Sequence, residues 1–162
     1  MKVATLRFSE IEVKEQEIIH FPQGLPGFEA LARFVIIKPD PELPFSFLQS
    51  IDDGDIAFIL TDPFLFFQDY EFEIPEPIKQ DLRIHEEKDV MVWTIVSIKE
   101  SLTDATANLL APVILNVREQ LGKQVILQNT SYRTKHPLLT AENPMPPMTE
   151  EDGHASASSQ KG

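Results

Sequence analysis

The sequence predicts a mainly β protein, folded as a small antiparallel or mixed β-barrel-like domain with one or two short helices. Two observations point to this class. About nine short apolar runs, many rich in Val, Ile and Phe, are separated by turn residues. No long stretch repeats apolar residues with the period of an amphipathic helix. Closing the sheet on itself would remove open strand edges, so a closed or nearly closed barrel is favoured.

The first part of the chain contains the expected strands 3–8, 11–13, 17–21 and 34–37. Between the last two lies a loop over residues 22–27, which holds two prolines and two glycines. We expect Gly24 and Gly27 to supply unusual backbone angles there, because glycine tolerates positive φ. This loop is therefore interpreted as a structural feature.

A hairpin is predicted next, from strands 45–50 and 56–61 joined by residues 51–55. Its turn contains Asp53-Gly54, a pair that tolerates positive φ at a tight turn. Residues 68–74 alternate as an edge strand would. Residues 75–84 fit one short helix, because Pro77 suits its first turn.

The strongest predicted strand covers residues 90–98 and carries Trp93, the single tryptophan. Residues 107–115 and 124–128 are expected to form another strand pair, joined through residues 116–123. The domain is predicted to span residues 1–140. Residues 141–162 are rich in Pro, Ser and acids and poor in apolar bulk, so they are predicted to form a disordered tail.

Charge is the most unusual feature of the composition, with a formal net charge of −12 over 162 residues. Residues 39–78 hold ten acids and neither Lys nor Arg. Such a surface should repel nucleic-acid phosphates and attract basic protein surfaces. The alternative is a solvated face that only keeps the protein soluble. We expect no direct nucleic-acid binding.

Several function classes find no support in the sequence. It has no cysteine, no signal-peptide pattern and no apolar run long enough to cross a bilayer, so a cytoplasmic protein without membrane contact is expected. Motifs of hydrolases, zinc proteases and phosphate-binding loops are missing, so no enzyme activity and no cofactor are expected. Two alternatives remain open: an enzyme that uses the barrel mouth as a pocket, and a calcium- or metal-binding protein. Residues 52–55 themselves lack the ligand register of a calcium loop and are interpreted as a hairpin turn.

Aromatic and acidic residues are interleaved between residues 62 and 74. Strand alternation would place Tyr70, Phe72 and Ile74 on one face and the acids on the other. The simplest interpretation is that these aromatics belong to the core. Phe66 and Phe67, however, are neighbours in a loop and are hard to bury together. An apolar anchor ringed by acids would suit a partner segment that is both apolar and basic.

An ordered set of motifs resembles the flagellar assembly factor FliW family over roughly residues 1–140. The matching pieces are Phe21-Pro22-Gln23-Gly24-Leu25-Pro26-Gly27-Phe28, Phe47-Leu48-Gln49-Ser50, Ala57-Phe58, Asp62-Pro63, Asp69-Tyr70, Thr106-Ala107-Asn108-Leu109, Ala111-Pro112, Asn116 and Gly122-Lys123-Gln124-Val125-Ile126-Leu127. The resemblance implies a protein-binding regulator that binds flagellin. When free of flagellin, it would sequester the translational repressor CsrA and relieve repression of flagellin mRNA translation. A dedicated flagellin chaperone with little effect on translation is the alternative.

With this resemblance, residue roles can be assigned as expectations. Partner contact is expected from Phe66, Phe67, Asp69, Tyr70 and Glu71, with Asn129 and Tyr132 as second choices. Electrostatic exclusion of RNA from CsrA is expected from Asp52, Asp53, Asp55 and Asp62. Asn108 is expected to satisfy backbone groups of a turn. The free protein is expected to be monomeric.

Overall fold

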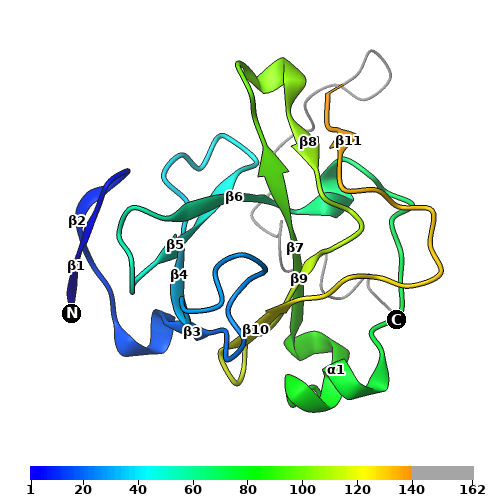
Figure 1. Ribbon diagram of the computed structural model, residues 1–162, viewed down its shortest axis with the longest axis horizontal. Helices are drawn as coiled ribbons and strands as arrows, with labels where there is room; N and C mark the ends of the chain where they lie inside the picture. The colour runs from blue at the N-terminus through cyan, green and yellow to red at the C-terminus, as the bar shows by residue number, and fades with distance from the viewer. Residues whose placement is uncertain (140–162) are drawn as a thin grey trace.

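A computed structural model describes residues 1–139. Seven strands form a closed ring in the order β7-β6-β5-β4-β3-β10-β9, and β9 returns to pair with β7 (Figure 1). Their bounds are β3 Ile19–His20, β4 Arg33–Ile37, β5 Ser46–Ser50, β6 Ala57–Thr61, β7 Val90–Ser97, β9 Val113–Asn116 and β10 Leu121–Gln124. The predicted barrel is confirmed.

The long strand β7 closes the ring because it pairs with different neighbours along its length. Val90 to Trp93 lie opposite β9, whereas residues 94–96 lie opposite β6. Beyond β9, the end of β7 also pairs with β8 (Thr106–Ala107), and β8 pairs with β11 (His136–Pro137). β11 thus lies beside the barrel rather than within its ring.

A hairpin, one α-helix and short 3-10 turns complete the described fold. Strands β1 (Lys2–Thr5) and β2 (Ser9–Glu12) form a separate antiparallel hairpin that lies at one side of the barrel (Figure 1). Helix α1 (Glu76–Asp81) confirms the short helix predicted at 75–84. Short 3-10 turns occur at Glu15–Glu17, Pro63–Leu65, Glu87–Asp89 and Leu102–Asp104. None of the helices in this part of the chain is both long and apolar enough to cross a membrane.

The apolar core is divided by the barrel wall. One cluster takes side chains from opposite strands, including Phe34, Leu48, Leu60 and Trp93, and therefore fills the barrel interior. A second cluster packs on the other face of β7 and β9, where residues alternating with the first set point outward. A third, smaller cluster joins the β1–β2 hairpin to β4. The second cluster positions the candidate site.

Three sequence predictions are wrong in detail. Residues 68–74 do not form a strand, although Tyr70, Phe72 and Ile74 are buried as the alternation predicted. The second strand pair is Val113–Asn116 with Leu121–Gln124, because Asn116 accepts hydrogen bonds from the backbone of Arg118 and Glu119 and closes a short turn earlier than expected.

The third difference concerns the Asp53-Gly54 turn of the confirmed β5–β6 hairpin. Gly54 does not have a positive φ; Gly24 and Gly27 do, as predicted. At Gly54 a Cβ atom would lie 2.0 Å from the carbonyl oxygen of Ala4, so glycine is required by the close approach of the β1–β2 hairpin. Leu6 N–H also donates to Gly54 O at 3.0 Å. A long-range contact, not local turn geometry, selects this glycine.

Candidate functional site

A hollow of about 650 Å³ lies where the segment after β6 meets the chain leading into β11. Both sides come from irregular backbone supported by the outer core cluster. Aromatic rings and a few polar groups form the lining. We call this site the aromatic groove, and its lining residues are Leu65, Phe66, Phe67, Gln68, Asp69, Tyr70, Leu109, Tyr132, His136 and Pro137.

The first wall of the aromatic groove begins with a capped 3-10 turn. Asp62 is 2% exposed, and its carboxylate accepts a hydrogen bond from Phe64 N–H at 2.9 Å. Pro63 then starts the turn, and its carbonyl accepts from Phe66 N–H at 3.2 Å and Phe67 N–H at 2.8 Å. At the end of this turn the two adjacent Phe side chains point in different directions.

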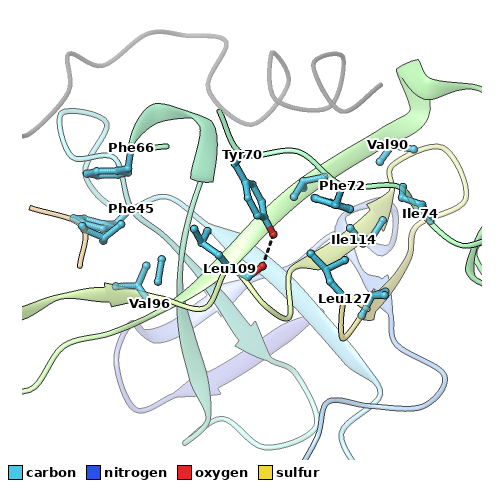
Figure 2. Packing of buried hydrophobic residues seen from close by; sticks show 14 of the residues in the cluster. Phe45, Phe66, Tyr70, Phe72, Ile74, Val90, Val96, Leu109, Ile114 and Leu127 are labelled. Carbon is cyan, nitrogen blue, oxygen red and sulfur yellow. Dashed lines mark hydrogen bonds between the residues drawn. The ribbon is translucent and has the colours of Figure 1, made fainter. Parts of the chain in front are cut away.

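Phe66 points inward and Phe67 does not. The Phe66 ring is 5% exposed and stacks on Phe45, with ring centroids 6.3 Å apart (Figure 2). Phe67 is only partly buried and meets the edge of His136, with ring centroids 5.9 Å apart. Phe66 therefore supports the groove from below, while Phe67 offers ring surface at its wall.

Tyr70 anchors the floor of the aromatic groove. It is 3% exposed, and its hydroxyl donates to Leu109 O at 2.7 Å (Figure 2). Burial, and to a lesser extent the neighbouring Tyr132, raise the pKa of Tyr70, so the hydroxyl stays protonated as a donor. The Tyr70 ring packs edge to face against Tyr132, with ring centroids 4.8 Å apart.

Tyr132 ties the two walls together. Its hydroxyl accepts a hydrogen bond from Glu71 N–H at 3.1 Å and donates to Glu71 O at 3.2 Å. The main chain of the irregular segment is thus paired with a side chain 61 positions later in place of a neighbouring strand. This bond explains how residues 68–74 remain ordered without the predicted edge strand.

His136 forms part of the second wall. Its Nε2 accepts a hydrogen bond from Arg133 N–H at 2.8 Å. This bond requires that Nε2 carries no proton, so the ring is neutral. Partial burial, and then the nearby Arg133 charge, lower the pKa of His136. His136 also faces Tyr132, with ring centroids 6.2 Å apart. Its side chain therefore presents an uncharged ring to the groove near neutral pH.

The two rims of the aromatic groove have opposite charge. Asp69 lies in the lining and Glu71 is exposed beside it. Arg133 and Lys135 are exposed on the segment that forms the other wall. A polypeptide segment with an apolar centre and charged ends could satisfy both rims.

The predicted partner-contact residues divide into three groups. Phe67, Asp69 and Tyr132 line the aromatic groove with accessible surface. Phe66 and Tyr70 also line it, but they are core side chains, because the 3-10 turn and the Leu109 hydrogen bond direct them inward. Sequence inspection missed Leu109 and His136 as groove residues.

The remaining two partner-contact choices do not line the hollow. Glu71 lies beside it, attached through its backbone to Tyr132. Asn129 is exposed and has a φ of 56°, which marks it as a turn residue. Asn108, predicted to satisfy a turn, accepts a hydrogen bond from Ala111 N–H at 3.0 Å.

The four acids expected to exclude RNA have unequal surroundings. Asp52 is paired with Arg33, with Arg33 Nη2 and Asp52 Oδ1 2.9 Å apart, and it also accepts from the N–H groups of Ala32 and Arg33. Asp62 is the buried cap described above, so it presents no surface charge. Asp53 and Asp55 remain exposed. Within residues 1–139, no group of three or more acidic or His side chains is arranged to hold a metal ion.

Comparisons with known proteins identify a consistent set of relatives. The sequence model of the family described as FliW protein matches residues 2–138. The flagellar assembly factor FliW of Alkaliphilus metalliredigens is 44% identical over 140 residues, covering 86% of each chain. That of Geobacillus kaustophilus is 43% identical over 138 residues, which is 85% of this chain and 95% of the relative. A crystal structure of the flagellar assembly factor FliW superposes with a TM-score of 0.81 and 40% identity, over 86% of this chain and 98% of the other.

Proposed function

The chain belongs to the FliW family of flagellar assembly factors, and we propose that it acts by binding protein partners at the aromatic groove, without catalysing a reaction. The proposed partners are flagellin and, when flagellin is absent, a CsrA-type translational repressor. Holding the repressor would relieve repression of flagellin mRNA translation. The proposed site of action is the cytoplasm, and the proposed free state is a monomer.

The aromatic groove is the observation that carries this proposal. Three rings of the groove are partly buried and are held in place by contacts with neighbouring rings: Phe67, Tyr132 and His136. Aromatic side chains of this kind dominate binding energy at protein interfaces. Because the rings are held in place before binding, less conformational entropy is lost on association. The opposite charges of the two rims would fix the direction in which a partner segment lies along the groove.

The proposed effect on RNA depends on a weaker field than the sequence indicated. Asp52 is neutralised by Arg33 and Asp62 is buried, so the exposed Asp53 and Asp55 are left to repel phosphates near a bound repressor. Such repulsion acts within about a Debye length, ~8 Å at physiological salt.

The groove proposal is tested with Phe67→Ala in the full chain and isothermal titration calorimetry against purified flagellin and purified CsrA. Truncating a partly exposed interface ring should weaken binding of at least one partner by about tenfold or more. Val117→Ala is the matched control, because Val117 is 40% exposed between β9 and β10 and belongs to neither the groove nor the turn at residues 52–55. Equal affinity of Phe67→Ala and wild type for both partners would exclude the groove as the binding site.

The same titrations separate the two binding roles. A regulator of translation binds CsrA in the absence of flagellin, whereas a dedicated flagellin chaperone binds flagellin alone. The repulsion hypothesis needs a further variant, Asp53→Lys with Asp55→Lys, which keeps the Asp52–Arg33 pair intact. If this variant binds CsrA normally and still displaces RNA, repulsion by these two charges is not the mechanism.

A further inference from the structure

The sequence that follows the described residues contains a short apolar segment with unusual composition. Residues 144–148 read Pro-Met-Pro-Pro-Met, and Glu150, Glu151 and Asp152 follow them closely. The match to the family model ends at residue 138. Any role of this segment is therefore outside the family resemblance and must be argued from its own chemistry.

The aromatic groove has the chemistry that such a segment prefers. Proline-rich segments adopt an extended helix with little entropic cost and dock in grooves lined by aromatic side chains. Methionine sulfur also makes favourable contacts with the edges of aromatic rings. Phe67, Tyr132 and His136 provide three such rings on facing walls.

Chain connectivity holds the segment close to the groove. Pro137 lines the groove, Leu138 is fully buried, and Leu139 packs on the outer core cluster. Pro144 follows only five residues after Leu139. Five residues span at most about 17 Å, so the groove lies within reach of a segment that starts at Pro144.

Charge favours the same contact. The rim formed by Arg133 and Lys135 is basic, whereas the protein as a whole has a net charge of −12. The acids at 150–152 are repelled by most of the molecule and attracted to this rim. An apolar Pro/Met centre in the groove would place them within reach of it.

We propose that residues 144–148 of the same chain occupy the aromatic groove and compete with the protein partner. This proposal rests on the proposed function of the groove as the partner site. A tethered segment has an effective concentration in the millimolar range. An intrinsic dissociation constant of about 1 mM would thus leave the groove roughly half occupied and weaken apparent partner affinity about twofold.

Docking is tested directly by disulfide trapping, because the chain has no cysteine of its own. In the full chain, Gln68→Cys at the groove is combined with Met145→Cys, and bridge formation is followed in dilute protein under a glutathione buffer. The control pair is Thr103→Cys with Met145→Cys, since Thr103 is exposed, outside the groove, and two residues from Ala105, whose carbonyl accepts from Leu138 N–H at 3.0 Å.

We expect the groove pair to form its intramolecular bridge at least tenfold faster than the control pair. Equal rates for the two pairs would overturn docking. Disulfide-linked dimers in place of bridged monomers would also overturn it, in favour of the segment of a second copy. No partner protein is present in this experiment, so its result does not depend on the proposed function.

Competition is tested with Met145→Ser and Met148→Ser combined in the full chain. The variant should bind flagellin about twofold more tightly, because the groove is vacated. Ser156→Ala with Ser158→Ala is the matched control and should leave the affinity unchanged. Unchanged affinity of the methionine variant would overturn competition. Failure of the wild-type protein to bind either partner would instead overturn the proposed function, with the trapping result still decisive for docking.

Discussion

The turn at residues 52–55 and the segment at residues 69–76 are both rich in acids, yet the structure uses these acids differently. In the turn, Asp52 is held by Arg33 and by two backbone N–H groups, and Asp53 accepts from Asp55 N–H at 3.0 Å. Along 69–76 the acids lie on the exposed side while Tyr70, Phe72 and Ile74 fill the core.

This difference shows that acid density in a sequence does not measure surface charge. A carboxylate next to backbone donors is used as an acceptor, within its own turn at Asp62 and across 19 and 20 positions of the sequence at Asp52. A carboxylate that alternates with core aromatics is left facing solvent, as at Glu71 and Glu73. The two regions are therefore expected to respond differently to substitution: the groove segment through its buried rings, and the turn through its hydrogen-bonded carboxylate.

The largest effect is expected at Tyr70. Tyr70→Ala removes a buried ring and should lower the free energy of unfolding by about 3–5 kcal/mol. Tyr70→Phe keeps the ring but leaves Leu109 O without its donor, at a cost of about 1–3 kcal/mol. Urea denaturation followed by Trp93 fluorescence measures both. If Tyr70→Ala is no more harmful than Tyr70→Phe, the ring is not part of the supporting core.

A smaller effect is expected at Asp52. Asp52→Asn weakens the pairing with Arg33 and the acceptance of two backbone N–H groups, and should cost about 1–2 kcal/mol because the side chain is partly exposed. Asp53→Asn in the same turn is the matched control, and a change below about 0.5 kcal/mol is expected for it. Equal losses in urea denaturation would mean that the two carboxylates do not differ as described.

The contribution of Asp52 to the free energy of unfolding depends on pH in a defined direction. Burial alone would raise the pKa of Asp52, but hydrogen bonds from Ala32 and Arg33 and the Arg33 charge outweigh it and lower the pKa. A lowered carboxyl pKa stabilises the fold above the ordinary value of about 3.9, and this stability is lost as pH falls through the lowered value. The stability difference between wild type and Asp52→Asn should therefore shrink below about pH 4.

The smallest effect is expected at His136. Because its pKa is lowered in the folded protein, its contribution is fully present above the ordinary value of about 6.5 and is lost as pH falls through the lowered pKa. Protonation would also break the bond from Arg133 N–H. The melting temperature, measured at pH 7.5 and at pH 5.5, should fall less between these values for His136→Gln than for wild type. His85→Gln, an exposed histidine outside the groove, is the matched control.

Part of the candidate site could be predicted from the sequence. The interleaved aromatics and acids at 62–74 indicated the segment, and Phe67, Asp69 and Tyr132 do line the groove. The inward turn of Phe66 could not be predicted, because it depends on the Asp62 cap and on the position of Phe45. His136 gave only a weak signal, as part of a short basic run, and its neighbours Phe67 and Tyr132 become visible only in the fold.

By itself, the sequence determined the β-rich class, the β5–β6 hairpin, the strand β7, the short helix α1 and the family, because local periodicity, turn residues and ordered motifs depend on neighbouring positions. Only the tertiary structure decided which acids remain free, why Gly54 is required and where residues 68–74 find their hydrogen bonds. These outcomes depend on atoms brought together from distant parts of the chain. Tyr132 and Glu71 meet because the chain leading into β11, which pairs with β8, lies against the segment after β6, and that proximity is not encoded in either segment alone.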